Sequence, residues 1–566
     1  RPEGEMMRSL VRLLKGSLWL FDKAEYLLLV SLLSLMVGLA FLQIFLRIFF
    51  NTGILWGDPL LRNVLLWAGL LGATMATKEG KHINIDVISR LLPGRGNVAI
   101  QAVTNLFSAF ICVLLLQASL KFVRDEFQAG TLAFLKIPIW KYSMIFLSGI
   151  ITVALALLGT PLFIIISASA LLNFYLVGID SSIVPIEMYR MANTPMLIAI
   201  PLFAFAGYVL AESEAPSRLV RISKAFLGWL PGGLAVVALL ACTLFTAFTG
   251  ASGVTIIALG GLLFPALMSE KYPEKFSLGL LTTSGSLGLL LPPSLPLILY
   301  GVITKTSIDR LFIAGIVPGM LLVLLLSLFS VYKGLEAEVP LARVTLREVT
   351  DAIRIAKWEL PLPAIVLGGI YSGYIAISEA AAITAFCVVV VEVGIYREVK
   401  LRDLPQIMQK SMVLVGGILI ILGAALALTN YLVDAEVPMK ILSLLKTRIE
   451  SKLVFLIMLN IFLLVVGCMI DIFSALVVVV PLITPIAQAY AIDPVHLGII
   501  FLVNLGIGYS TPPVGMNLFI SSFRFDRPVM KLYIASLPFL AILLLALMII
   551  TYIPGLSLFL VKMVAP

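Results

Sequence analysis

Two pairs of adjacent prolines, each inside a long apolar segment, constrain the fold of this chain most. One pair is Pro292-Pro293 and the other is Pro512-Pro513, 220 positions later (512 − 292). Proline lacks an amide donor and clashes with the preceding helical turn, so each pair predicts a break in a helix. Lipid cannot satisfy the backbone groups that a break frees. Broken helices therefore persist in membranes only where they contact protein or line a cavity.

Further helix breakers recur at the same offset. They pair Pro265 with Pro485, Pro318 with Pro538, and Gly288 with Gly508. This agreement predicts two structural repeats, which we expect to be inverted. Interrupted segments at matching positions of two halves are the sequence feature that points to the binding site of a secondary transporter.

The composition places the chain in a bilayer. Of its 566 residues, 61% are hydrophobic and only 13% are charged, whereas a soluble domain carries about 25% charged residues. Apolar stretches of the ~20 residues that a spanning helix needs recur along the whole chain. We therefore expect an all-α polytopic membrane protein. It has no phosphate-binding loop and no catalytic constellation, so we expect neither ATPase nor other enzyme activity, and no organic cofactor.

The net charge of +9 has a simple explanation in such a protein. Lys and Arg gather in cytoplasmic loops of membrane proteins, so the excess does not predict a nucleic-acid partner. Basic residues cluster near 8–15, 78–95, 343–357 and 397–402, and we place these loops inside. The segment 51–58 has no basic residue and is expected outside.

The four cysteines all lie in apolar stretches without pairing or metal-binding spacing, so no metal other than sodium is expected.

Two modules are predicted. Residues 1–140 form a small helical scaffold module, and residues 141–566 form a larger module rich in Gly and Pro. The stretch 138–178 is almost continuously apolar and longer than one span requires. It fits either two short segments or one long tilted helix, and this choice sets the orientation of every later span.

The larger module contains two predicted re-entrant hairpins, each followed by an interrupted helix. The first hairpin is expected near 240–268 with the cluster Thr249-Gly-Ala-Ser-Gly253 at its tip, and its interrupted helix near 277–303. The second is expected near 453–491 with Asp471 and Ser474 at its tip, and its interrupted helix near 495–521.

Half-helices of this kind expose backbone groups that bind ions. Amides at a helix N-terminus attract a carboxylate, and carbonyls at a C-terminus, with side-chain oxygens, coordinate a hard cation such as sodium. We predict two sodium sites with the substrate between them. The predicted sodium-binding residues are Thr249, Gly250, Ser252, Gly285, Gly288, Asp471, Ser474, Asn504, Gly508, Thr511 and Gly515. The predicted substrate-binding residues are Ser252, Ser284, Pro292, Ser294, Thr511 and Pro512.

Structural roles compete with this prediction. Gly and Ser in membrane helices often serve close helix packing, and for each of them this explanation is as good as ion binding. Asp471 is different, because an acid within the membrane is costly and is functional by default; it either helps to bind a cation or holds the hairpin tip. Glu379 is the next candidate, and capping of a helix explains it equally well.

Several of these segments resemble one family. The sequences 201–207, 248–253, 288–296, 313–319 and 508–516 closely resemble the large membrane subunit of tripartite ATP-independent periplasmic (TRAP) transporters. Residues 56–93, which include Trp56, Trp67 and the stretch from Lys81 to Asp86, resemble the small membrane subunit less strongly. The chain is thus similar to a fused membrane component of a TRAP transporter.

The resemblance implies sodium-coupled import of an organic acid that a separate periplasmic binding protein delivers. It implies a multi-pass protein of the bacterial inner membrane, surrounded by lipid. It also implies an elevator movement, in which a transport domain with both hairpins slides against a scaffold that the small module extends. Fused members usually have a distinct connecting helix, whereas 138–178 looks too short for a final small-subunit helix, a connector and a full first large-subunit helix.

The alternative is a stand-alone sodium/carboxylate symporter that needs no binding protein, although the small module has no evident use in one. A channel gives no reason for paired hairpins. The substrate is not determined by the sequence: C4-dicarboxylates are the first choice, and other organic acids or sialic-acid-like sugars are the alternatives.

Overall fold

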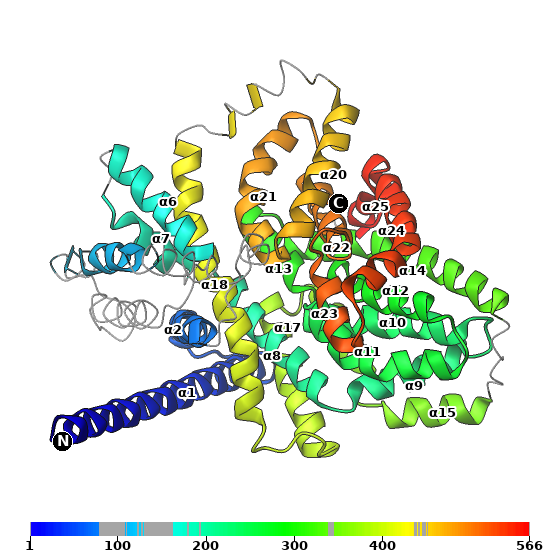
Figure 1. Ribbon diagram of the computed structural model, residues 1–566, viewed down its shortest axis with the longest axis horizontal. Coiled ribbons are helices and arrows are strands. Elements are labelled where there is room, and N and C mark those ends of the chain that lie inside the picture. The colour runs from blue at the N-terminus through cyan, green and yellow to red at the C-terminus, as the bar shows by residue number, and fades with distance from the viewer. Residues whose placement is uncertain are drawn as a thin grey trace.

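All the secondary structure of the described residues is helical in the computed structural model (Figure 1). The structure describes residues 2–78, parts of 108–128, residues 162–177, 180–191, 194–337, 345–434 and 451–564, and a few single positions between 434 and 451; side chains are described from Asp22 onward. Among these residues, ten helices are long and apolar enough to cross a membrane, or up to eleven if one bent helix pair counts as a span.

The first group of helices precedes the first predicted hairpin. It consists of α1 (Pro2–Phe50), α2 (Gly57–Lys78), α6 (Leu162–Val177), α7 (Ile183–Arg190), the 3₁₀ helix η3 (Pro195–Ile198), α8 (Ala199–Glu212) and α9 (Ala215–Leu227). The predicted boundary between the two modules, most of the stretch 138–178 and the segment from Lys81 to Asp86 lie outside the described residues.

The remaining helices follow in two runs. The first run is α10 (Gly233–Thr249), α11 (Ser252–Ser269), α12 (Glu274–Ser284), η4 (Leu287–Leu290), α13 (Leu295–Thr304), α14 (Ile308–Glu336), α15 (Leu346–Ile355), α16 (Pro361–Tyr371), α17 (Ile377–Val389) and the π-helix η5 (Val390–Ile395). The second is α18 (Leu404–Asp434), α20 (Lys452–Met469), α21 (Ile472–Ala489), α22 (Pro494–Gly508), α23 (Met516–Phe525), α24 (Val529–Tyr552) and α25 (Gly555–Val564).

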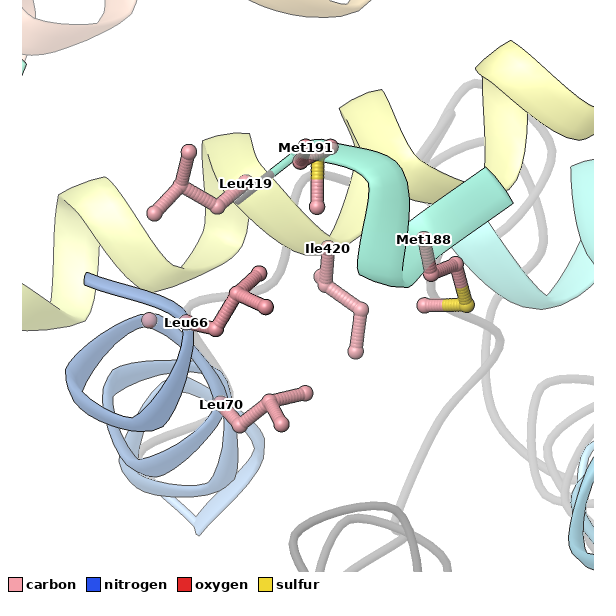
Figure 2. Close-up of a pocket in the computed structure, with 7 residues that line it drawn as sticks. Leu66, Leu70, Met188, Met191, Leu419 and Ile420 are labelled. Carbon is pink, nitrogen blue, oxygen red and sulfur yellow. The ribbon is translucent and has the colours of Figure 1, made fainter. Parts of the chain in front are cut away.

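One part of the molecule joins the N-terminal helices to the middle of the chain. The long helix α18 packs against α2, α6, α7 and α8, and α17 packs against α1 and α8 (Figure 1). Figure 2 shows the contact of α2, α7 and α18, where Leu66, Met188 and Ile420 face one another. The void between them is about 10 Å³, room for one water at most, and its lining is apolar. This contact is a packed helix interface.

The other part contains the helices on which the predicted site depends. Here α10–α14 and α20–α25 lie together (Figure 1), and their bounds follow the offset seen in the sequence. Helix α11 spans 252–269 and α21 spans 472–489, while α12 begins at 274 and α22 at 494. Helix α11 packs against α23, and α21 packs against α13, which is the same pairing with the halves exchanged.

Both helices break where the paired prolines predict. Helix α12 ends at Ser284 and α13 begins at Leu295. The segment Glu274–Leu290 and the helix Leu295–Thr304 differ in direction by 43°. Helix α22 ends at Gly508 and α23 begins at Met516. The peptide bonds Pro292-Pro293 and Pro512-Pro513 are both cis. The breaks place non-helical backbone beside the turns that join α10 to α11 and α20 to α21.

Candidate functional site

The first turn, residues 249–252, is called here the first tip. Helix α10 ends at Thr249, and Gly250 follows in the left-handed region with φ 65°. Only glycine adopts this backbone conformation at low cost. A side chain there would also collide with Leu295, the first residue after the break of the neighbouring helix. Close contact between the tip and the broken helix therefore depends on Gly250.

Hydroxyl groups tie the first tip to its surroundings. The Ser252 hydroxyl donates to Asn517 Oδ1 at 2.8 Å, and Asn517 Nδ2 donates to the Thr282 carbonyl at 3.2 Å. The Thr246 hydroxyl donates to the Gly285 carbonyl at 2.9 Å and lies 2.6 Å from that of Thr255. Because Asn517 belongs to α23, this network joins the two halves of the larger module.

The second tip, residues 470–474, is organised by Asp471. Asp471 is the N-cap of α21: its Oδ1 accepts from the amides of Phe473 at 2.9 Å and Ser474 at 3.2 Å, and its Oδ2 accepts from the Ser474 hydroxyl. A carboxylate at this position satisfies free amides and complements the helix dipole. The hydroxyl of Tyr509, at the break of α22, accepts from the amide of Ile472. The structure thus gives Asp471 the tip-holding role.

Gly288 and Gly508 serve close packing at equivalent places. A Cβ at Gly288 would lie 2.1 Å from the Thr243 carbonyl oxygen and 2.6 Å from the Ala247 amide, both on α10. A Cβ at Gly508 would lie 2.6 Å from the backbone of Gly467 on α20. Each broken helix thus touches the first helix of its own hairpin through a glycine. Similarly, the Gly515 amide donates to the Cys468 carbonyl at 3.0 Å.

Most other predicted residues lie at the two breaks, with their hydroxyls bonded locally. Ser284 donates to Leu281 at 3.3 Å, Thr511 donates to Ile507 at 2.9 Å, and Ser294 donates to Leu289. Pro292 is partly buried and Pro512 is exposed. The three hydroxyl groups therefore lie near the tips, but each donates to a backbone carbonyl of its own segment.

The side chain of Asn504 makes its hydrogen bonds away from the second tip. Its Nδ2 donates to Asn460 Oδ1 at 2.9 Å, and its Oδ1 is buried without a partner. Asn460 precedes Asp471 by 11 positions (471 − 460), and most of this stretch is helix, so the two are about 16 Å apart at 1.5 Å per residue. Asn504 therefore belongs to a buried network with Asn460 and Thr551. Its assignment to sodium stays a prediction that this geometry does not favour.

Glu379 lies at the other part of the molecule. It accepts from the amide of the N-cap residue Ala376 at 2.7 Å, and it forms an ion pair with Arg47 of α1. Capping is thus what this residue does. It also lines a cavity of about 260 Å³ between α1, α2, η3 and α17, together with Gln43 and Arg62.

Sequence reasoning missed four residues of the site. Asn517, Thr246, Thr282 and Tyr509 make the contacts that join tips and breaks. A signal existed for Asn517, which is a polar residue in the apolar half of an interrupted helix. No comparable signal marks the threonines, because a threonine hydroxyl satisfied within its own helix is common.

Comparison with known proteins identifies the family of this chain. Residues 149–556 match the family described as "Tripartite ATP-independent periplasmic transporter, DctM component", and residues 36–162 match its DctQ component. The chain belongs to the TRAP transporter family. It is a fused small and large membrane subunit, a multi-pass protein of the bacterial inner membrane.

Individual relatives of this TRAP permease agree. The C4-dicarboxylate TRAP transporter large permease protein DctM of Pseudomonas aeruginosa is 37% identical over 374 residues, covering 66% of this chain and 88% of the relative. The isethionate TRAP transporter permease protein DctMQ of Oleidesulfovibrio alaskensis is 29% identical and covers 89% of this chain and 88% of the relative. The ectoine/5-hydroxyectoine large permease UehC of Ruegeria pomeroyi is 32% identical, covering 72% and 96%.

Proposed function

We propose that this TRAP permease imports an organic acid together with sodium, and that a periplasmic binding protein delivers the substrate. The family is tripartite and ATP-independent by description, which leaves an ion gradient as the source of energy. The binding protein is the component that the two fused membrane subunits do not supply.

The observation that carries this proposal is the meeting of two tips with two broken helices. Each tip lies against the break of a neighbouring helix, and Ser252 and Asn517 bridge the halves at 2.8 Å. Helix ends at one place supply both amides and carbonyls with partial charges of about half an electron. Such an arrangement suits cations and a carboxylate held together.

The two sodium ions are assigned to the two tips. The first would be held by oxygens around Thr249, Gly250, Ser252, Gly285 and Gly288, and the second by those around Asp471, Ser474, Gly508, Thr511 and Gly515. Gly288 and Gly508 would act by bringing backbone close. Backbone carbonyls and hydroxyls are the ligands that a hard cation prefers. Asp471 would supply the one carboxylate of the second site while it continues to cap α21.

The substrate is assigned between the tips, next to Ser252, Ser284, Pro292, Ser294, Thr511 and Pro512. None of these residues is cationic, so amide dipoles and hydroxyls would hold the carboxylate. A C4-dicarboxylate is the first choice, in line with the Pseudomonas relative. Relatives named for a sulfonate and for ectoine keep the class wider than dicarboxylates. We expect the binding protein to set much of the selectivity.

The movement proposed is of the elevator type, based on inverted repeats. The helices with the tips would slide against α1, α2, α8, α17 and α18. Both tips belong to one cluster of helices, and the helices of the small module pack in the other part of the molecule. This separation is what a sliding domain and a fixed scaffold require.

Uptake into proteoliposomes tests the proposal. Labelled succinate and a panel of other organic acids are offered with and without an inward sodium gradient and with and without a candidate binding protein. Uptake that requires both supports the proposal. Sodium-driven uptake without a binding protein would instead establish a self-sufficient symporter, and uptake that ignores sodium would exclude the coupling ion.

A further inference from the structure

Helix α9 joins the two parts of the molecule and does not cross the membrane. It follows α8, a candidate span, and leads into α10, the first helix of the first hairpin. Its 13 residues extend about 20 Å, less than the ~30 Å of a hydrocarbon core. The helix also carries three basic residues, Arg218, Arg221 and Lys224.

The basic residue nearest the start of α9 is buried in an ionic cluster. The Arg218 side chain is 6% exposed. Its Nε lies 3.0 and 3.1 Å from the two carboxylate oxygens of Glu359, its Nη2 lies 2.6 Å from Glu359 and 3.0 Å from Glu392, and its Nη1 pairs with Glu398. The ring of Tyr396 lies 4.2 Å from the guanidinium carbon. All three guanidinium nitrogens are therefore engaged, in a geometry that only arginine provides.

The partners of Arg218 belong to the part of the molecule that contains the small module. Glu392 and Glu398 follow α17, which packs against α1 and α8, and Glu359 lies between α15 and α16. Glu398 also accepts from the amide of Glu214 at 2.9 Å, at the N-cap of α9. The cluster therefore fixes both the side chain and the first turn of α9.

The other end of α9 is attached to the helices that carry the tips. The turn 228–232 leads into α10, and Gly232 has φ 76°. A Cβ at Gly232 would lie 2.6 Å from the Ser330 carbonyl of α14, and one at Gly334 would lie 2.3 Å from the Gly232 Cα. Helix α14 packs against α10, α22, α24 and α25. Glycine thus permits a direct backbone contact that links this turn to the tip-bearing helices.

We propose that Arg218 is a positioning residue for transport. It fixes the first turn of α9 to the α17 side, so that α9 pivots at its other end, where it meets the turn 228–232 that moves with the tip-bearing helices, and not at the cluster. This inference rests on the sliding movement of the proposed function. Loss of the guanidinium frees the first turn of α9, and the moving helices then lose their fixed point.

Spin-label distances test the inference. In a variant whose cysteines 112, 242, 387 and 468 are replaced by alanine, one pair of labels spans the cluster through Arg221→Cys and Arg402→Cys, both at exposed positions. A second pair spans the two parts through Ile257→Cys and Tyr374→Cys, at positions 51% and 83% exposed. Distances are measured in choline chloride, in sodium chloride, and in sodium chloride with succinate.

We expect the main distance between the labels at 257 and 374 to shift between conditions. The distance between the labels at 221 and 402 should keep one narrow distribution in all conditions. With Arg218→Gln the first pair broadens, and maximal uptake falls on the order of tenfold at an unchanged half-saturating concentration. Arg218→Lys does not restore maximal uptake, and Arg221→Gln, on the same helix, leaves maximal uptake unchanged. Should Arg218→Gln fail to fold, the double variant Arg218→Gln/Glu392→Gln, which also removes a buried carboxylate, replaces it.

Two results would overturn the inference, and they differ in what they say of the proposed function. If the label distances of both pairs shift together in the protein that keeps Arg218, the two parts of the molecule move but Arg218 is not the fixed point. If the second pair does not shift although sodium-driven uptake is measured, no sliding movement exists for α9 to guide.

Discussion

The hydroxyl of Ser286 donates to the backbone carbonyl of Gly506 at 2.9 Å, and the two residues are 220 positions apart. This is the offset of the paired prolines, so corresponding residues of the two halves touch each other. Corresponding residues meet only near the axis that relates two copies of a structure. The contact is what the predicted repeat requires of residues close to its axis, and it joins the breaks of the two interrupted helices.

Ser286→Ala should destabilise the protein by about 0.6 kcal/mol, the typical value for an interhelical hydrogen bond in a membrane protein. Thermal unfolding of the solubilised protein measures this. Ser411→Ala is the matched control, because the equally buried Ser411 hydroxyl bonds to Met408 of its own helix at 2.9 Å. Equal loss of stability in both variants would show that the contact between halves adds nothing.

Gly288→Ala and Gly508→Ala should each cost about 1–3 kcal/mol, as overpacking does, because backbone atoms lie within 2.6 Å of the added methyl group. Uptake should fall with stability. Gly506→Ala is the control on the same helix as Gly508: its nearest neighbour would be 3.7 Å away, and alanine is a better helix former. Similar behaviour of Gly506→Ala and Gly508→Ala would contradict this account.

Asp471→Asn should separate the two roles of the second tip. Asparagine caps a helix as well as aspartate does, so folding should be retained, whereas the loss of negative charge should abolish sodium-dependent uptake. Asp471→Ala should abolish uptake as well while the protein still reaches the membrane. Dependence of the uptake rate on sodium concentration is the measurement.

The control for this charge change is Asp493→Asn. Asp493 caps α22 in the same way, accepting from the amides of Val495 at 2.8 Å and His496 at 3.4 Å, but it lies at the far end of α22 from the break. Its variant should keep normal sodium dependence. Normal transport by Asp471→Asn would remove the Asp471 charge from the mechanism.

Ser252 and Asn517 should act as one unit in transport. Each single alanine variant should lower uptake, and the double variant should be little worse than the poorer single variant, because both remove the same bridge. A double-mutant cycle on uptake and on stability gives the coupling. Independent, additive effects would mean that the 2.8 Å contact is incidental.

The tips illustrate what a sequence pattern leaves open. The paired prolines predict the breaks, and the structure places them there. For Asp471, however, the sequence leaves open whether it binds a cation or holds the tip, and the capping bonds to Phe473 and Ser474 appear only once the backbone is folded. Asn504 was grouped with Asp471 from sequence position alone, and the rotation of α22 turns it toward Asn460.

The sequence by itself determined the helical membrane class, the two breaks, their common offset and the family, because proline, glycine and apolar length act through the local backbone and the solvent. The tertiary structure decided which polar groups meet. The Ser252–Asn517 bridge, the Ser286–Gly506 contact and the Arg218 cluster join residues 141 to 265 positions apart in the chain. Such contacts depend on how helices pack and rotate against one another, which no local pattern specifies.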